Sequence, residues 1–439
     1  MRMNVRIIKK GGMVMGERAY LCIDLKSFYA SVECVERGLD PMKALLVVAD
    51  PERSEKTICL AVSPAMKALG VKNRCRVFEI PKNISYIMAP PRMQKYIDYA
   101  AAIYGVYLQY ISPDDIHVYS IDEAFLDVTP YLQRYGKTPR EMAVMLMEEV
   151  WKQVGVRAAC GIGSNLYLAK VALDITAKHA RDFIGWLDEA EYRKTLWRHQ
   201  PLTDFWRIGH GISQRLSKYG IYTMEQLAHA EEELLYREFG IDAELLIDHA
   251  WGRESATIPD IHAFTPRSNS FTSGQVLMRD YTFEEGKIIV REMMDALCLD
   301  MAAKHLVTPS VSLMVGYAKE DGGPMARGTA AFGTESNVDR VILPAVSALY
   351  ERIVDPEKKI RRMYLNCNQL QPQMKNARQV SFFDTEMNLG REKDRMRQEA
   401  VVDIHRKFGK NALLRGIDLL DAATARERNL QIGGHKSGE

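Results

Sequence analysis

The chain has 439 residues, of which 47% are hydrophobic and 26% are charged, and its formal net charge is +2. This length predicts two to four domains with a substantial hydrophobic core, and the composition is ordinary for a soluble globular protein. The absence of any run of about 18 apolar residues excludes a membrane-spanning helix, and a net charge near zero indicates no particular class of partner.

The cysteines and the first residues bear on the cellular compartment. Seven cysteines are scattered along the chain without a C-x-x-C pair, which predicts reduced thiols and neither disulfides nor a zinc site. The first twenty residues are basic but lack the apolar stretch of a secretory signal. We therefore expect a cytoplasmic protein that does not associate with membranes.

The first 180 residues alternate between apolar strand patterns and helical patterns. In chain order we predict a strand ending at Asp24, a helix over 27–37, strands over 44–50 and 57–63, helices over 64–70 and 92–110, a strand segment over 117–128, a helix after Thr138 and Pro139, a strand over 156–163 and a helix over 165–178. This order is typical of a βαββαβ unit in an α+β fold.

The rest of the chain predicts a helical region and then a second mixed unit. Residues 184–258 have nearly all helical patterns. After a linker, strands are predicted over 271–277, 310–319, 327–332 and 361–370, with helices over 284–304 and 337–354 between them. The tail from residue 371 is expected to hold one charged helix near 391–408 and to end in a mobile segment.

Two adjacent acids interrupt a segment that otherwise has strand character. The stretch HVYSIDEAFLDV (117–128) contains Asp122 and Glu123 with no basic residue beside them, although acids are poor strand formers and costly to bury. Asp24 ends another predicted strand of the same unit, so we expect the three carboxylates to cluster. Oxygen ligands without His or Cys suit Mg²⁺. The alternative is that these acids cap turns or pair with distant arginines.

Four motifs occur in order along the chain: CIDLKSFYASVE, AVSPAMKALGV, VYSIDEAFLDV and GIGSNLYLAKVALDITAK. Together they resemble the Y-family DNA polymerases, particularly the UmuC-like branch of Gram-positive bacteria, over about residues 18–435. The resemblance implies an α+β right-hand fold. Its parts would be a ferredoxin-like palm (1–28 and 94–183), small fingers (29–93), a helical thumb (184–258), a βαββαβ little finger (265–370) and a C-terminal tail (371–439).

The resemblance also assigns the metal site. Asp24, Asp122 and Glu123 match the family's catalytic carboxylates, which together with the backbone carbonyl of Leu25 would bind two Mg²⁺ ions. Ions bound in this way support in-line phosphoryl transfer to a primer.

Three further positions match residues that contact the incoming dNTP in the family. Tyr29 matches the aromatic steric gate that excludes a 2′-hydroxyl, and Lys67 and Lys170 match basic residues that face the triphosphate. Taken alone, Tyr29 is more typical of a core aromatic on an amphipathic helix, and each of the two lysines is more typical of a solvated helix position. Two departures put nucleotide affinity and selectivity in question: Pro64 stands where many members have Tyr, and Lys26 where others have Asp or Asn.

Two segments outside the palm suggest macromolecular partners. Gly209 and Gly211 resemble a helix-hairpin-helix, in which glycine dihedrals form a tight hairpin whose N–H groups bind a DNA phosphate; the alternative is an ordinary corner between helices. In the tail, QVSFF resembles a peptide that binds the bacterial sliding clamp, with Gln379 making amide hydrogen bonds and Phe382 and Phe383 filling an apolar groove. The two phenylalanines could instead pack against the little finger.

The resemblance implies a template-directed DNA polymerase that adds dNTPs to a primer 3′ end in translesion synthesis and SOS-type damage tolerance. A nucleotidyl cyclase also sets paired acids on a ferredoxin-like palm, but it needs neither a helix-hairpin-helix nor a second βαββαβ unit. A non-catalytic DNA- or clamp-binding accessory protein is the other alternative, against which the three intact acids argue. The sequence leaves open the lesions bypassed, the fidelity and any need for a RecA-like recombinase.

Overall fold

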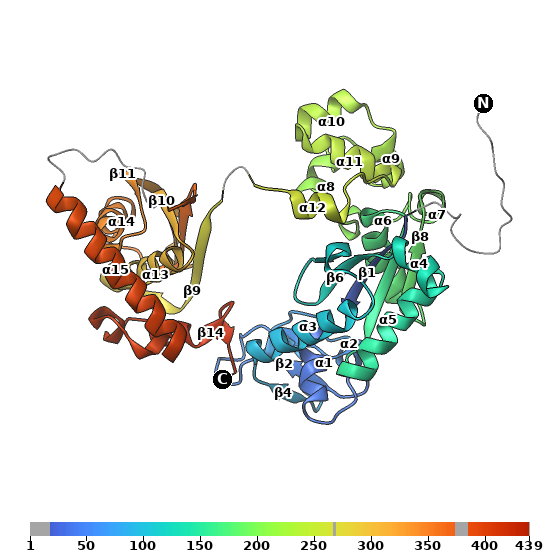
Figure 1. Cartoon of the computed structure of the whole chain (residues 1–439), viewed down its shortest axis with the longest axis horizontal. Coiled ribbons are helices and arrows are strands. Elements are labelled where there is room, and N and C mark those ends of the chain that lie inside the picture. The colour runs from blue at the N-terminus through green and yellow to red at the C-terminus, as the bar shows by residue number, and fades with distance from the viewer. Residues whose placement is uncertain (1–17, 267–268, 374–384, 439) are drawn as a thin grey trace. The chain divides into compact units, whose positions relative to one another are not determined.

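The computed structural model describes residues 18–266, 269–373 and 385–438. The chain divides into two compact units, one comprising the residues up to Phe264 with the last two residues of the chain, and the other Thr265–Ser437 (Figure 1). We call them unit 1 and unit 2 and describe each by itself. Among the described residues, no helix is both long and apolar enough to cross a membrane. All seven cysteines are free and buried.

Unit 1 contains a five-stranded sheet in the region predicted as the palm, and we call it the palm sheet. Its strands lie in the order β5 (Ile116–Val118), β6 (Glu123–Asp127), β1 (Tyr20–Leu25), β7 (Ala158–Gly163) and β8 (Ile184–Leu187). β1 is antiparallel to both of its neighbours, and β8 is parallel to β7. β1 and β7 lie in the interior of the sheet and are almost continuously apolar and buried, which is typical of strands that have packed elements on both faces.

Helices cover the palm sheet. α3 (Met93–Leu108) packs against α5 (Pro139–Val154), which contacts β7, and α6 (Leu166–Val171) contacts both β1 and β7. A short helix, α4 (Thr129–Tyr135), follows β6. The predicted helix after Thr138 and Pro139 is confirmed, and the Thr138 side chain and Glu141 form a capping box at its start.

The structure corrects two predictions in this region. β8 belongs to the palm sheet, so the prediction of an almost entirely helical segment from residue 184 is wrong at its start. The predicted helix over 165–178 is also irregular, since α6 continues as a π-helical turn over Ala172–Thr176 and a 3₁₀ turn over Ala177–His179. A four-residue strand of the sequence IGWL carries too little alternation to be separated from its helical surroundings.

The region predicted as the fingers contains a small sheet of three strands in the order β3 (Ala61–Val62), β2 (Leu46–Val48) and β4 (Ile87–Ala89). α1 (Phe28–Val35) leads into the fingers, and α2 (Pro64–Ala68) begins behind the N-cap Ser63, whose side chain accepts a hydrogen bond from Met66. This start agrees with the helix predicted over 64–70, and a Ser N-cap followed by Pro is typical of a helix start.

The region predicted as the thumb is mainly helical, and its hydrophobic core continues into α6 and β8. Its helices are α7 (Glu189–Thr195), α8 (His210–Ser217), α9 (Met224–Ala228), α10 (Glu232–Phe239), α11 (Asp242–Trp251) and α12 (Ile258–Ala263).

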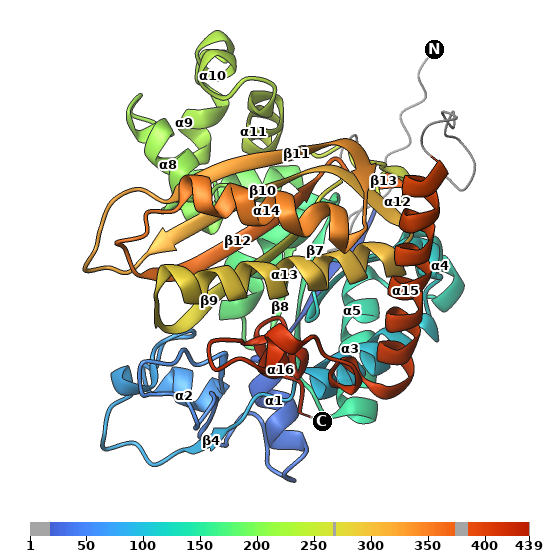
Figure 2. The ribbon, with the colours of Figure 1, turned by 90° about the vertical axis from the view of Figure 1, so that its left-hand side faces the viewer.

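Unit 2 contains an antiparallel four-stranded sheet in the order β11 (Ala326–Ser336), β10 (Leu306–Tyr317), β12 (Ile360–Asn368) and β9 (Phe271–Tyr281). Figure 2 shows α13 (Phe283–Ala303) and α14 (Asp339–Ile353) against one face of this sheet, where they bury a common core. All four predicted strands and both predicted helices of this unit are confirmed.

The C-terminal segment is part of unit 2. After β13 (Gln371–Pro372), the chain forms α15 (Thr385–Phe408), α16 (Ala425–Asn429) and a hairpin of β14 (Gln431–Ile432) and β15 (His435–Lys436). The predicted charged helix is confirmed, whereas the prediction of a mobile end from residue 433 is wrong because β14 and β15 pair with each other.

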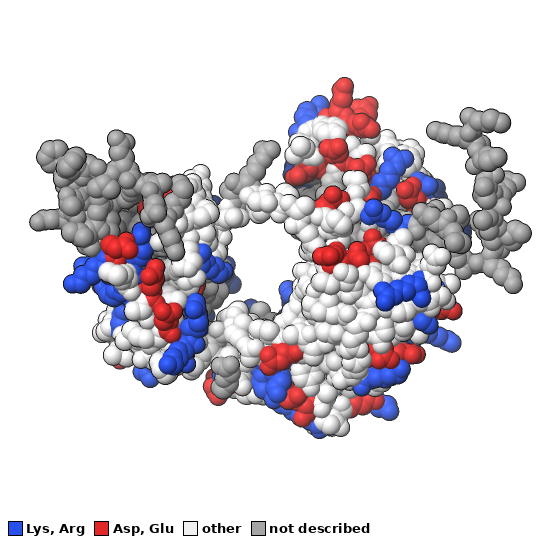
Figure 3. All heavy atoms as spheres, viewed as in Figure 1, with Lys and Arg blue, Asp and Glu red and all other residues white. Residues whose placement is uncertain are grey.

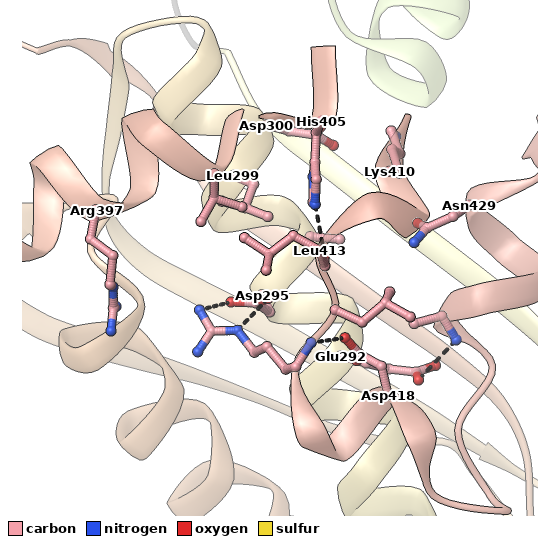
Figure 4. Close-up of a pocket in the computed structure, with 15 residues that line it drawn as sticks. Glu292, Asp295, Leu299, Asp300, Arg397, His405, Lys410, Leu413, Asp418 and Asn429 are labelled. Carbon is pink, nitrogen blue, oxygen red and sulfur yellow. Dashed lines mark hydrogen bonds and ion pairs between the residues drawn. The ribbon is translucent and has the colours of Figure 1, made fainter. Parts of the chain in front are cut away.

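Buried charges attach this segment to the two helices of unit 2. Asp339, with 1% of its surface exposed, accepts hydrogen bonds from Arg397 at 2.7 Å and from Arg415. Glu292 on α13 accepts hydrogen bonds from the backbone N–H of Thr424 at 2.9 Å. Figure 4 shows the pocket that α13 lines together with the C-terminal segment. Neither contact was visible in the sequence, because each joins residues more than fifty positions apart.

Candidate active site

Strand pairing brings the predicted acids together. In the antiparallel pairing of β1 with β6, Asp24 lies opposite Glu123. The next residue on β1, Leu25, donates its backbone N–H to the carbonyl oxygen of Asp122 at 2.9 Å. The prediction that neighbouring strands place Asp24 beside the later acids is therefore confirmed.

Asp122 lies in a tight turn, residues 119–122, that we call the acid turn. The backbone N–H groups of Tyr119 and Ser120 both donate to the carbonyl oxygen of Glu123, at 2.9 and 3.1 Å. The Ser120 hydroxyl donates to Asp122 Oδ1 at 2.6 Å. The segment predicted as one strand is thus a hairpin of β5 and β6. Its bend removes the cost of placing an acid inside a strand, because Asp122 reaches solvent.

Glu123 is paired, contrary to the expectation from its neighbours in sequence. Lys170 on α6 approaches its carboxylate at 2.8 Å and also forms an ion pair with Asp174 at 3.0 Å. The thiol of Cys22 donates to the same carboxylate at 3.1 Å. Burial lowers the pKa of Lys170, but Cys22, Glu123 and Asp174 together outweigh burial and hold that pKa above its ordinary value. The lysine predicted to face the triphosphate therefore contacts Glu123, one of the three acids predicted to be catalytic.

Two glycines in β7 allow α6 to bring Lys170 this close. A Cβ atom at Gly163 would lie 2.1 Å from the backbone nitrogen of Ala169, and one at Gly161 would lie 2.1 Å from the Ala169 carbonyl oxygen. Any side chain at these two positions would push α6 away from the sheet. Asn165 caps the start of the helix by accepting a hydrogen bond from Leu168.

Asp24 carries an unfavourable negative charge. Burial raises its pKa from the ordinary range to about 7, and the carboxylates of Asp122 and Glu123 add to this increase. The ammonium groups of Lys178 and Lys170 act in the opposite direction. Burial and the two neighbouring carboxylates raise the pKa of Asp24 more than the two lysines lower it. Binding of a cation beside the ionised Asp24 would therefore be favourable.

The donor atoms suit Mg²⁺, although the acids do not form a complete ligand set in this arrangement. Among the residues that the structure describes, no group of three His, Cys, Asp or Glu side chains is placed to hold a metal ion. Glu123 is ion-paired with Lys170 instead. The carboxylates of Asp24 and Asp122 and the carbonyl of Leu25 are hard oxygen ligands, which Mg²⁺ prefers. Glu123 would complete this set of metal ligands if its carboxylate moved away from the Lys170 ammonium.

Tyr29 lies next to this site and is held by a second aromatic residue. Its ring stacks on that of Tyr96, with centroids 4.4 Å apart and planes at 14°. Burial raises the pKa of the Tyr29 hydroxyl, and the nearby carboxylate of Asp122 contributes to the increase. Tyr96 was not singled out from the sequence, since it resembles any core aromatic of a helix.

Two lysines from the predicted motifs lie close to Asp24. Although the Lys67 side chain is exposed, partial loss of hydration lowers its pKa, and the Asp24 carboxylate opposes that decrease. Lys26 places its ammonium 3.7 Å from the centre of the Phe183 ring and is likewise near Asp24. Lys178, which forms an ion pair with Asp174 at 2.7 Å, was missed. The four-residue spacing of 170, 174 and 178 could have revealed it.

The predicted hairpin in the thumb has a different backbone from the one expected. Gly209 is the N-cap of α8 with φ −81°, and Gly211 lies within the helix. A Cβ atom at either position would meet nothing within 4 Å, so the prediction that glycine dihedrals form this hairpin is wrong. The left-handed residue of the loop is Arg207, with φ 68°. The absence of side chains at the two glycines instead leaves the first N–H groups of α8 accessible.

The clamp motif with Gln379, Phe382 and Phe383 lies outside the described residues.

Comparison with known proteins identifies the family of the chain. The model of the impB/mucB/samB family matches residues 23–174, and the model of that family's C-terminal domain matches residues 268–382. A putative UV-damage repair protein UvrX of Bacillus subtilis (strain 168) is 31% identical over 421 residues, covering 95% of this chain and 97% of that protein. DNA polymerase IV 2 of Halalkalibacterium halodurans is 29% identical over 425 residues, covering 95% and 99%.

A solved structure agrees with these matches at the level of the fold. A Y-family DNA polymerase chimera superimposes with a TM-score of 0.62 and 19% identity, covering 81% of this chain and 99% of that one. The matched domains lie on the palm and fingers and on unit 2, where the acids and the second sheet were found. The chain therefore belongs to the impB/mucB/samB family and has the fold of a Y-family DNA polymerase.

Proposed function

We propose that this protein is a template-directed DNA polymerase that extends a primer 3′ end with dNTPs during translesion synthesis. The observation that carries the proposal is the pairing of Asp24 with the strand that follows the acid turn, at the centre of the palm sheet. Relatives that match almost the whole chain and are named DNA polymerase IV 2 support it. Primer extension by the purified protein tests it directly, and the corresponding variant is described in the Discussion.

Asp24, Asp122, Glu123 and the Leu25 carbonyl would hold two Mg²⁺ ions. When bound, Mg²⁺ supplies activation of the attacking hydroxyl and neutralises charge on the triphosphate. The Lys170 ammonium neutralises the Glu123 carboxylate by forming an ion pair with it. If the Glu123 carboxylate turned toward a bound metal ion, the Lys170 ammonium would be available to the triphosphate, so that neither buried charge would be left unpaired.

Tyr29 is proposed to exclude ribonucleotides by steric contact with a 2′-hydroxyl. Replacing Tyr29 by Ala is expected to increase ribonucleotide incorporation relative to deoxyribonucleotide incorporation by about 10²-fold. This factor is the discrimination that a binding pocket typically achieves against one added hydroxyl group. Tyr29→Phe keeps the ring and is expected to keep the discrimination. Single-nucleotide insertion with rNTP and dNTP measures both ratios, and equal ratios for Tyr29→Ala and the wild type would contradict this role.

The N-terminus of α8 is proposed to bind a phosphate of the DNA backbone. Figure 3 shows acidic side chains at the tip of the thumb, around α10, where Glu231, Glu232 and Glu233 are exposed. These acids would repel a phosphate. The N-terminus of α8, where backbone N–H groups and the helix dipole favour an anion, is therefore the proposed DNA-binding side of the thumb.

Gly209→Asp tests this assignment, because Asp is a good N-cap and preserves the helix while adding a negative charge. Its affinity for duplex DNA is expected to fall by about 10-fold at low salt. Gly209→Ser, a neutral N-cap, is the matched control and is expected to bind DNA like the wild type. Fluorescence anisotropy measures both constants; equal affinities for the Asp and Ser variants would refute the phosphate site.

We also propose that the segment 379–383 binds the bacterial sliding clamp. Replacing Phe382 and Phe383 together by Ala is expected to leave extension of a short primed template unchanged and to remove its stimulation by added clamp. Undiminished stimulation would exclude this segment as the binding peptide. Whether a RecA-like recombinase is needed is tested by adding it to the same reaction.

A further inference from the structure

One direct side-chain contact joins the acid turn of the palm to the loop before α8 in the thumb. Trp206 Nε1 donates a hydrogen bond to the hydroxyl of Tyr119 at 3.1 Å, and the two rings meet edge to face with centroids 5.9 Å apart. Tyr119 is 46% exposed. A large aromatic residue at a solvent-exposed turn contributes little to the core, so its role is to be sought in this contact.

Tyr119 is tied firmly to the acids. Its backbone N–H donates to the carbonyl oxygen of Glu123 at 2.9 Å, and its ring packs edge to face on Phe125 with centroids 5.8 Å apart. Only Ser120 and Ile121 separate it from Asp122. A displacement of the Tyr119 side chain therefore moves the turn that carries Asp122.

Trp206 is held equally firmly on the thumb side. It lies three residues before Gly209, and its indole is nearly parallel to the His249 ring, at 18° and 6.3 Å. His249 is 2% exposed and stacks in turn on Tyr167 at 3.9 Å. Arg207, which follows Trp206, adopts a left-handed backbone conformation that is unfavourable for a residue with a side chain. The direction of the loop from Trp206 to α8 is thus fixed by packing.

A groove runs past this contact from one site to the other. Its lining includes Asp174, which is the second partner of Lys170, together with Tyr119, Trp206 and Gly209. The hydrogen bond between Tyr119 and Trp206 consequently lies between the ion pair of the catalytic acids and the phosphate site proposed on α8.

We propose that Tyr119 and Trp206 are positioning residues that couple binding of primer-template DNA at the α8 N-terminus to binding of Mg²⁺ at the acid turn. This inference rests on the proposed polymerase function. Neither residue touches the reacting atoms; each fixes one element against the other. Because coupling between two binding sites is reciprocal, Mg²⁺ tightens DNA binding by the same factor by which DNA tightens Mg²⁺ binding.

The experiment measures the DNA dissociation constant of the whole protein with and without Mg²⁺. A fluorescent primer-template with a 3′-dideoxy end prevents extension, and anisotropy is recorded in EDTA and in saturating Mg²⁺. The variants are Trp206→Phe, which loses the N–H donor but keeps a ring, Tyr119→Phe, which loses the acceptor hydroxyl, and the double variant. Trp186→Phe, at an exposed position of β8, is the matched control.

Mg²⁺ is expected to tighten DNA binding by the wild type and by Trp186→Phe about 5- to 100-fold. In each single variant, the factor by which Mg²⁺ tightens DNA binding is expected to be about 3- to 10-fold smaller than in the wild type, which is the effect of losing one hydrogen bond. The DNA affinity of each single variant in EDTA is expected to stay unchanged. The double variant is expected to lose no more than either single variant, because both remove the same bond.

Three outcomes would overturn the inference: a wild type whose DNA affinity is insensitive to Mg²⁺, single variants with an undiminished gain, or single variants that lose affinity equally in EDTA and Mg²⁺. The last would mean that Trp206 only shapes the DNA surface. Extension of an ordinary primer by the wild type is measured in parallel. If extension occurs while the coupling is absent, the inference fails and the proposed function stands; if no extension occurs even with clamp and recombinase added, the proposed function itself fails.

Discussion

Replacing Asp122 by Ala is expected to reduce primer extension with dNTPs and Mg²⁺ on the order of 10³-fold or more. The side chain is partly exposed at the end of the acid turn, directly before β6, where a metal ion and a triphosphate can reach it. Its loss would remove a carboxylate ligand of the metal ions, and these ions stabilise the negative charge of the transition state. Extension of a labelled primer by the wild type and the variant measures the effect.

Asp98→Ala is the matched control for this experiment, because Asp98 is an exposed acid on α3. It is expected to extend primers like the wild type. Equal extension by Asp122→Ala and the wild type would mean that the acid turn is not the metal site. Absence of extension by every protein, even with clamp and recombinase added, would favour the alternative of a non-catalytic DNA- or clamp-binding accessory protein.

Replacing Asp24 by Asn is expected to stabilise the metal-free protein at pH 8 while abolishing its activity. The pKa of Asp24 is about 7 in the folded protein and 3.8 for the unperturbed group. A carboxyl group whose pKa is raised by folding favours the folded state when protonated, so its stabilising contribution is present below pH 4 and is lost as the pH rises through 7. The ionised side chain then costs on the order of 2–4 kcal/mol, which Asn removes.

Thermal unfolding in EDTA at pH 4 to 8 tests this expectation. The melting temperature of Asp24→Asn should exceed that of the wild type by several degrees at pH 8 and match it near pH 4. Mg²⁺ should raise the melting temperature of the wild type but not that of Asp24→Asn, because this variant has lost a metal ligand. Asp98→Asn is the control and should follow the wild type. A variant less stable than the wild type at pH 8 would show that Asp24 is already compensated by the surrounding lysines.

The local sequence determined much of this protein. Ser63 with Pro64 and Thr138 with Pro139 each mark a helix start by a capping interaction that needs only neighbouring residues. Alternating and periodic apolar patterns were sufficient to predict the four long strands and two helices of unit 2, because one face of each element is buried against the others. The four ordered motifs around Asp24, Lys67, Asp122 and Lys170 were sufficient to indicate the family.

The tertiary structure decided what those residues do to one another. The ion pair of Glu123 with Lys170 joins positions 47 residues apart, and the hydrogen bond of Trp206 with Tyr119 joins positions 87 residues apart. The raised pKa of Asp24 comes from its burial at a strand end beside other acids. Patterns of neighbouring residues cannot supply these facts, because charge balance and positioning depend on which distant side chains the packing of helices onto the sheet brings within a few ångströms.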